Sequence, residues 1–177
     1  MIFTETKLRG AYVIEPEQLH DERGFFARTW SAAEFLEREL NVTLVQCNTS
    51  GNKRRGTLRG MHFQSAPHEE TKLVRCTAGA LYDVIVDLRP NSPTWGQWFG
   101  LELTCQNLRM LYIPEGFAHG YQTLADDTDV FYQMSAYYHP DSARGVRWDD
   151  PTIAIDWPLD VSVISRRDQM LPLIDAR

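Results

Sequence analysis

Cysteine is scarce in this sequence, and no long apolar run occurs in it. The 177 residues include three cysteines, Cys47, Cys76 and Cys105, an odd number whose spacing fits neither a disulfide framework nor a zinc site. We therefore expect reduced, buried thiols and a cytoplasmic protein. No apolar segment approaches the length of a membrane span. The opening residues, MIFTETKLRG, lack the basic-then-apolar order of a signal peptide.

The chain also lacks an excess of positive charge. Its 24 acidic residues outnumber its 18 basic residues, and the formal net charge is −6 at pH 7. This balance argues against a general nucleic-acid surface, so an anionic ligand would need a local cluster of basic side chains. The residues available for such a cluster are Arg23, Arg54, Arg55, Arg59, Lys72 and Arg75.

No linker, repeat or low-complexity stretch divides residues 1–177, which predicts a single domain. One helix is indicated by a capping box from Ser31 to Glu34 and the helix-forming run that follows it to Leu40. Almost everything else is typical of short strands, and the tail after Pro151 is expected to be irregular, with turns or a short helix. The expected strands are 43–48, 57–63, 72–78, 80–88, 97–104, 109–113, 119–124 and 129–138.

Two segments place a histidine shortly after a turn. Residues 56–64 read GTLRGMHFQ and contain His62, whereas residues 112–120 read YIPEGFAHG and contain His119. The spacings G-x5-H and P-x-G-x2-H resemble the two motifs of the cupin barrel, a double-stranded β-helix. The resemblance predicts that both histidines lie in one site.

The remaining metal-ligand positions of the cupin motif hold other residues in this chain. Metal-binding cupins have a second histidine and a glutamate there, and this sequence has Gln64 and Lys72. An ammonium group would repel a divalent cation, so a histidine pair with a lysine favours proton transfer and anion stabilisation over metal ligation.

Strand alternation makes two further predictions. Arg59 and His62 have opposite parity in the strand 57–63, so they face one site only if Gly60 marks a bulge. Asp83 lies among apolar neighbours in the strand 80–88, where it is either a buried, paired carboxylate or a rim residue. A contact between Asp83 and His119 is one way to pair it.

Eight segments, in order along nearly the whole chain, carry a family resemblance. They are DERGFF at 21–26, VQCNTS at 45–50, GTLRGMHFQ at 56–64, KLVRCTAGALYDVIVDLRPNSPTWGQW at 72–98, LYIPEGFAHGYQTL at 111–124, VFYQMSAYYHP at 130–140, GVRWDDPTIAIDWP at 145–158 and SRRD at 165–168. Together they resemble the dTDP-4-dehydrorhamnose 3,5-epimerases of the cupin superfamily. The resemblance implies a mainly β cupin jelly roll and a homodimer.

The implied substrate is a nucleoside-diphospho-4-keto-6-deoxyhexose. Its C3 and C5 protons are both α to the C4 ketone, so removing either one gives an enolate. Inversion needs a base on one face and an acid on the other. Neither a metal nor a redox cofactor is required if a cation stabilises the enolate oxygen.

Four residues would carry this chemistry. His62 is the expected base, because its unperturbed pKa of about 6.5 suits proton abstraction at neutral pH. By resemblance, Asp168 orients His62, Tyr132 delivers a proton to the opposite face, and Lys72 lies near the C4 oxyanion. Each residue also has a competing interpretation. His62 could be a packed barrel histidine, and Asp168 a surface carboxylate in the polar SRRD segment. Tyr132 could be an aromatic core residue, and Lys72 a lysine that protects a strand edge from aggregation.

Further residues would bind the nucleotide, as the resemblance implies. Tyr138 would stack on the base, His119 would hydrogen-bond within the site, and Arg23 and Phe26 would come from the partner subunit. Arginine forks suit diphosphate oxygens. The residues expected at the nucleotide are Arg23, Gln46, Asn48, Arg59 and Arg167.

Two positions depart from the family pattern. Arg28 stands where the family commonly has an acidic residue, which could accept a hydrogen bond from thymine N3–H. An arginine only donates, so the nucleobase stays open between thymine and cytosine. Arg167 stands where many relatives have lysine, which keeps the charge but changes the geometry. A solvated surface arginine is an equally good interpretation of Arg167.

The sequence thus favours a cofactor-independent epimerase that converts dTDP-4-dehydro-6-deoxyglucose to dTDP-4-dehydro-L-rhamnose. An epimerase acting at one carbon, or on a CDP-linked sugar, is the first alternative. A cupin that only binds a sugar nucleotide is the second, although binding alone needs neither a base nor an acid. A metal-dependent oxygenase is the third, and it is disfavoured because only two histidines stand at ligand-like positions.

Overall fold

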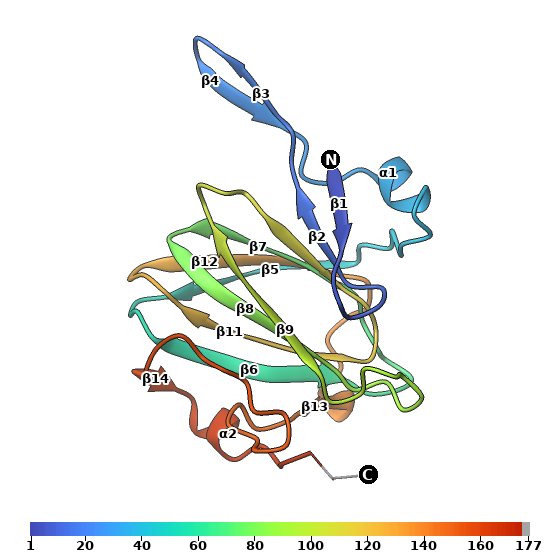
Figure 1. Cartoon of the computed structure of the whole chain (residues 1–177), viewed down its shortest axis with the longest axis vertical. Helices are drawn as coiled ribbons and strands as arrows, with labels where there is room; N and C mark the ends of the chain where they lie inside the picture. Colours follow the sequence, from blue (N-terminus) through green and yellow to red (C-terminus); the bar gives the residue numbers. More distant parts are fainter. Residues whose placement is uncertain (175–177) are drawn as a thin grey trace.

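Two antiparallel sheets face each other in the computed structural model, which describes residues 1–174 (Figure 1). The first sheet has the strand order β1 (Ile2–Glu5), β2 (Tyr12–Glu15), β10 (Met110–Ile113), β7 (Lys72–Ala78), β12 (Thr128–Met134) and β5 (Gln46–Asn52). The second has the order β13 (Ala143–Gly145), β6 (Thr57–Gln64), β11 (Phe117–Thr123), β8 (Ala80–Asp87) and β9 (Trp98–Thr104). The predicted mainly β fold is confirmed.

The main core lies between the two sheets. Val74 and Leu111 enter it from the first sheet, and Leu81 and Ile85 enter it from the second. All four side chains are fully buried. Since each strand alternates its side chains between two faces, burying one face of each sheet leaves the outer faces for solvent and for the terminal segments.

The eight predicted strands are present close to their predicted positions, but β1, β2 and β13 of the two sheets were not predicted. Two boundaries differ informatively. The strand predicted to begin at residue 43 begins at Gln46, and the one predicted to reach residue 138 ends at Met134. Met134 pairs with Lys72 on one side and with Gln46 on the other, and these two residues are the first of β7 and β5. The regular ladder therefore ends where both neighbouring strands begin, which local propensity does not reveal.

The early helix exists, but the predicted capping box is wrong. Helix α1 spans Ala32–Leu36, and the Ser31 side chain makes no capping hydrogen bond. The Glu34 carboxylate instead lies 2.9 Å from the N-terminal ammonium of Met1 and 3.0 Å from a guanidinium nitrogen of Arg28. The helix is shorter than predicted, and Glu39 just beyond it has a left-handed φ of 59°, a conformation common after helix ends.

A hairpin and a C-terminal segment complete the described chain. The hairpin of β3 (Gln18–Asp21) and β4 (Gly24–Ala27) projects beyond the two sheets (Figure 1). The tail is irregular, as predicted, with the short helix α2 (Arg166–Gln169). A 3-10 turn (Pro140–Ser142) precedes β13, and the two-residue strand β14 (Val163–Ile164) pairs in parallel with β6.

The cysteines lie in three different environments. All three are free thiols, and burial raises the pKa of the Cys76 thiol to about 11. Cys47 is exposed, so the expectation of buried cysteines is wrong for this residue. Its strand, β5, is an edge strand that alternates between inward and exposed side chains. Within residues 1–174, no helix is long and apolar enough to span a membrane.

Candidate active site

A bulge at Gly60 shapes the strand at the centre of the site. His119 of β11 pairs with His62 of β6, and Tyr121 pairs with Arg59, so β6 carries one extra residue between these pairs. Gly60 has a φ of 130°, and a Cβ atom at this position would lie 2.5 Å from Cα of Gly120. Only glycine suits this conformation and this close approach. The predicted bulge is confirmed, and it turns Arg59 and His62 toward one cavity.

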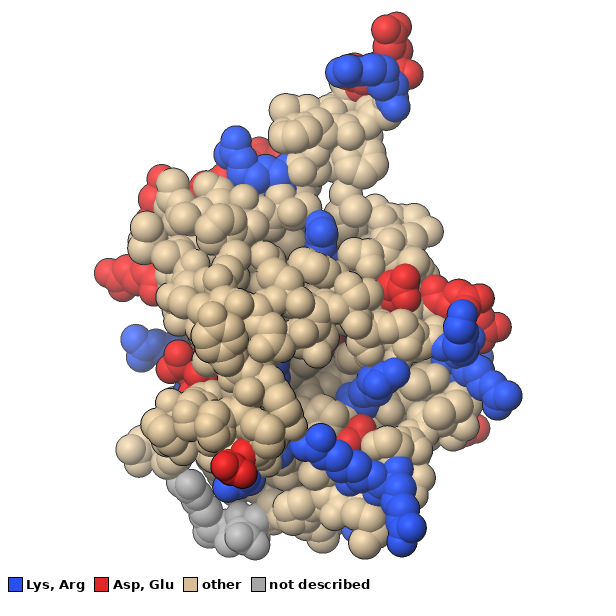
Figure 2. Space-filling model, turned by 180° about the vertical axis from the view of Figure 1, so that it is seen from behind, with Lys and Arg blue, Asp and Glu red and all other residues tan. Residues whose placement is uncertain are grey.

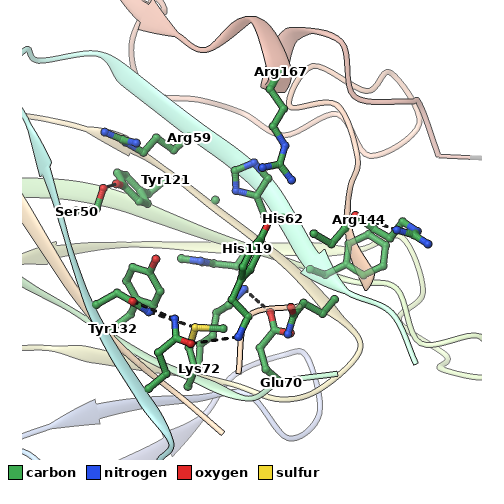
Figure 3. A pocket seen from close by; sticks show the side chains of 18 residues that line it. Ser50, Arg59, His62, Glu70, Lys72, His119, Tyr121, Tyr132, Arg144 and Arg167 are labelled. Atoms are coloured by element: carbon green, nitrogen blue, oxygen red, sulfur yellow. Dashed lines mark hydrogen bonds and ion pairs between the residues drawn. The ribbon is translucent and has the colours of Figure 1, made fainter. Parts of the chain in front are cut away.

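The cavity has a volume of about 440 Å³ and lies between the two sheets. Figure 3 shows side chains from both sheets pointing into it. The surface in Figure 2 has basic side chains gathered beside its central hollow. The lining residues are Gln46, Asn48, Ser50, Arg59, His62, Phe63, Gln64, Glu70, Lys72, His119, Gly120, Tyr121, Tyr132, Met134, Tyr138, Ala143, Arg144 and Arg167.

Asp168 reaches His62 from the far end of the chain. Its Oδ1 atom lies 2.7 Å from His62 Nε2, and its Oδ2 atom accepts a hydrogen bond from the Gly60 amide at 3.2 Å. The Ser165 side chain accepts a hydrogen bond from the Asp168 amide, which begins α2 and fixes this geometry. Asp168 is thus buried rather than in a surface turn, with 4% of the residue exposed.

The environment of Asp168 keeps its carboxyl group ionised at neutral pH. Burial alone would raise its pKa, but the hydrogen bond to His62 and the bonds from Gly60 and Ser165 together lower the pKa below its usual value. An ionised Asp168 accepts the hydrogen on His62 Nε2, orients the ring and stabilises its protonated form. The other ring nitrogen of His62 is then the one that can take a proton.

Tyr132 and Lys72 line the cavity from the opposite sheet. They lie on β12 and β7, whereas His62 lies on β6 (Figure 3). Burial raises the pKa of the Tyr132 hydroxyl, so this group is protonated at neutral pH. The Lys72 ammonium lies 2.8 Å from the Glu70 carboxylate, and their side chains are 10% and 3% exposed.

A second histidine–aspartate pair lies deeper in the barrel. His119 Nε2 is 2.7 Å from Oδ1 of Asp83, which is fully buried. The sequence left Asp83 as either a buried, paired carboxylate or a rim residue. The structure confirms the first interpretation, with His119 as the partner. On the same strand as His119, the hydroxyl of Tyr121 donates to Ser50 at 2.9 Å.

The cavity also gathers most residues expected to bind the nucleotide. Arg59 is oriented by a 2.8 Å hydrogen bond from its Nε to Asn52, which belongs to β5. Gln46 donates to Asn48 at 3.1 Å and accepts from the Tyr138 amide at 3.1 Å. Arg167, which the sequence left between a site and a surface role, lines the cavity.

Three of the expected binding residues lie outside this cavity. Arg23 and Phe26 belong to the hairpin, where Arg23 pairs with Asp21 at 2.6 Å. Arg28 follows the hairpin, and its guanidinium is 3.0 Å from Glu34. None of the three lines the cavity of its own chain.

Sequence reasoning missed four polar side chains of the cavity: Ser50, Glu70, Tyr121 and Arg144. It named Gln64, a fifth, only as the residue at a metal-ligand position of the cupin motif. Alternation could have found Ser50, which follows Gln46 and Asn48 on one face of β5, and Tyr121, two residues after His119. Glu70 precedes β7 in a loop, where no periodic pattern applies. Within residues 1–174, no group of three or more His, Cys, Asp or Glu residues is placed to hold a metal ion.

The chain is similar to known proteins over nearly its whole length. The family model described as dTDP-4-dehydrorhamnose 3,5-epimerase matches residues 5–176. A relative of that name from Methanothermobacter thermautotrophicus is 48% identical over 170 residues, which cover 94% of this chain and 91% of the relative.

Solved structures are similar over the same length. The Bacillus anthracis dTDP-4-dehydrorhamnose 3,5-epimerase, with TDP and PPi bound, has a TM-score of 0.94 and 42% identity, covering 98% of this chain and 99% of that one. The Legionella pneumophila dTDP-6-deoxy-D-glucose-3,5-epimerase, in complex with dTDP-4-keto-L-rhamnose, has a TM-score of 0.88 and 38% identity, covering 99% of each chain.

Proposed function

This chain belongs to the dTDP-4-dehydrorhamnose 3,5-epimerase family, and we propose that it inverts C3 and C5 of dTDP-4-dehydro-6-deoxyglucose by proton transfer between His62 and Tyr132. The observation that carries the proposal is the pairing of a buried Asp168 with His62 in a cavity that Tyr132 and Lys72 line from the opposing sheet. The product is dTDP-4-dehydro-L-rhamnose.

His62 removes the proton next to the ketone. Since Asp168 accepts the hydrogen on Nε2, the other ring nitrogen takes the substrate proton, and the imidazolium that forms is stabilised by the ionised Asp168. The Lys72 ammonium donates to the C4 oxygen as negative charge develops there. Its burial strengthens this interaction, because water screens it little.

Tyr132 returns a proton from the other side. Its hydroxyl is protonated at neutral pH because burial raises its pKa, so it can act as an acid. Base and acid enter the cavity from opposing sheets, as inversion requires. The same pair can act at C3 and at C5, because both carbons flank the C4 ketone, once His62 has released its proton to solvent and the Tyr132 phenolate has regained one.

The nucleotide is held by the polar and basic part of the cavity. Arg59 and Arg167 supply guanidinium groups for the diphosphate, and Gln46 and Asn48 supply amides. Tyr138 is 50% exposed at the edge of the cavity, where its ring can stack on the base.

The base assignment is tested by replacing His62 with alanine. Solvent-deuterium incorporation at C3 and C5 of dTDP-4-keto-6-deoxyglucose, followed by NMR in deuterated water, should fall at least about 100-fold, the lower end for a general base. His68→Asn is the matched control, because His68 does not line the cavity, and it should keep normal exchange. Unchanged exchange in His62→Ala would contradict the assignment.

The functional unit is proposed to be a homodimer whose hairpins complete the nucleotide sites. Leu19, Phe25 and Phe26 of the hairpin are 67%, 53% and 65% exposed, which is unfavourable for a surface in water. Figure 2 shows charged side chains of both signs at its tip and an uncharged body below them. A partner subunit would cover this body and receive Arg23 and Phe26 beside its cavity.

The cytoplasm is the proposed compartment. The three cysteines are free, and Cys47 is exposed. Exposed free thiols persist most readily where the surroundings are reducing.

A further inference from the structure

Glu70 is a buried carboxylate in the cavity wall, and the mechanism above does not use it. Its Oε1 atom lies 2.8 Å from Lys72 Nζ, and its side chain is 3% exposed. Its other oxygen, Oε2, accepts no hydrogen bond from any residue between 1 and 174. A buried carboxylate oxygen normally accepts a hydrogen bond, because burial removes its hydrogen bonds to water and leaving them unreplaced is unfavourable. The free acceptor points to a donor that belongs to a ligand.

The position of Glu70 distinguishes it from other unpaired groups. Within the described part of the chain, the only other buried polar side-chain atoms without a hydrogen-bond partner are Asp83 Oδ2 and His139 Nδ1. Neither Asp83 nor His139 lines the cavity, whereas Glu70 does. Figure 3 shows Glu70 beside Lys72 at the cavity. Glu70 therefore borders the space that a substrate would occupy, and its enclosed Oε2 meets a ligand when the side chain turns toward the cavity.

Lys72 and Glu70 together match the functional groups of the substrate. An ammonium only donates hydrogen bonds, and an ionised carboxylate only accepts them. The C4 ketone of the sugar only accepts, and the hydroxyl on the adjacent carbon C3 can donate. We infer that Glu70 is a substrate-binding residue whose Oε2 accepts the hydrogen bond of the C3 hydroxyl while Lys72 donates to the C4 oxygen. This inference rests on the proposed function.

The contact explains why a carboxylate is placed where negative charge develops. A bare carboxylate beside Lys72 would weaken the stabilisation that the ammonium gives to the enolate. A hydroxyl that donates to Glu70 Oε2 offsets part of the carboxylate's negative charge. It also aligns the ketone with Lys72. The site should therefore prefer sugars that carry a C3 hydroxyl over 3-deoxy sugars.

The test compares the effect of removing the C3 hydroxyl from the ligand in the native protein and in Glu70 variants. Binding affinity is measured by calorimetry on the full-length protein. The ligands are dTDP-6-deoxyglucose, which has no ketone and does not react, and its 3-deoxy and 2-deoxy counterparts. In the native protein, loss of the C3 hydroxyl should weaken binding roughly tenfold or more, as for hydrogen bonds to charged groups. In Glu70→Gln the same loss should be about threefold or less, since the charge is gone.

Two variants guard the result against changes in folding. Glu70→Ala removes the acceptor altogether, and Glu70→Gln preserves the shape of the side chain if the alanine variant fails to fold. Glu69→Gln is the matched control, because it removes a neighbouring charge that does not line the cavity. It should keep the full dependence on the C3 hydroxyl.

Three results would overturn the inference. They are full C3-hydroxyl dependence in Glu70→Gln, equal weakening of every ligand by Glu70→Gln, and a dependence on the C2 hydroxyl in place of C3. Deuterium exchange of the 4-keto substrate by the native protein separates this inference from the proposed function. If the C3-hydroxyl dependence does not require Glu70 but the native protein still exchanges deuterium, only the Glu70 contact is overturned. If the dependence requires Glu70 but no deuterium is exchanged, the contact is supported and the proposed reaction is overturned.

Discussion

The two histidines of the site differ in what their rings can reach. Each pairs with a buried aspartate at 2.7 Å, His62 with Asp168 and His119 with Asp83. The His62 side chain is 39% exposed and the His119 side chain 10%. Both histidines therefore make the same kind of pair with an aspartate, and they differ in how much of the ring is exposed. Both histidines line the cavity, but the His62 ring is open to it and the His119 ring is largely enclosed.

The proposed acid role of Tyr132 leads to a prediction about a single side chain. Tyr132→Phe should cut epimerisation by about 100-fold or more, the lower end for a general acid, while deuterium exchange at the carbon that His62 deprotonates should fall much less. Proton abstraction persists without the hydroxyl, but delivery to the other face does not. NMR in deuterated water reports both rates in one sample.

Tyr137→Phe is the control for that experiment. Tyr137 is 70% exposed and does not line the cavity, so both rates should match the native protein. Equal loss of exchange and epimerisation in Tyr132→Phe would count against the acid role.

At the scale of elements, β6 positions more of the site than any other strand described here. It pairs with β11, β13 and β14, and it carries Arg59 and His62 on the two sides of the Gly60 bulge. Because a strand alternates its side chains, a regular β6 would turn one of these two residues away from the cavity. The bulge is therefore the element that assembles the site.

Replacing Gly60 with alanine should destabilise the fold and remove activity together. The change forces an unfavourable φ on alanine and brings Cβ to 2.5 Å from Gly120 Cα. We expect a loss of at least about 2 kcal/mol in the free energy of unfolding, from backbone strain and the clash together, measured by urea denaturation.

Gly24→Ala is a matched control for Gly60→Ala. Gly24 has a φ of 129°, close to the 130° of Gly60, but a Cβ atom added to Gly24 would meet no atom within 4 Å. It should show only the cost of backbone strain. Equal destabilisation by the two substitutions would mean that the close approach to Gly120 is not what requires glycine.

At the scale of the whole molecule, the projecting hairpin predicts association. Light scattering coupled to size-exclusion chromatography should give twice the mass of a single chain. Leu19→Ser combined with Phe26→Ser should shift the protein toward the monomer and weaken dTDP binding, because both side chains are more than half exposed in the single chain and would be covered by the partner.

Met170→Ser serves as the control for association. Met170 is 75% exposed and follows α2, at the opposite end of the molecule from the hairpin (Figure 1). It should leave the mass unchanged. A monomeric native protein with full epimerase activity would contradict the proposed dimer.

Local sequence patterns were enough to predict several features of the fold and the site. The run 72–78 has the same bounds as β7, and the parity conflict between Arg59 and His62 located the bulge at Gly60. These predictions succeeded because alternation and glycine chemistry act over a few neighbouring residues. The resemblance to a family then singled out residues such as Lys72, whose roles remain predictions.

Local patterns left open which distant groups meet, and the pairing of Asp168 with His62 was implied only by the family resemblance before the tertiary structure showed the contact. Asp168 reaches His62 across 106 positions of the chain, and β12 ends at Met134 because its neighbours β5 and β7 begin there. Glu70 lies in a loop without any periodic pattern, yet folding buries it against Lys72 with one oxygen facing no donor. Strand pairing and loop burial are properties of the assembled sheets, so local sequence patterns carry no record of them.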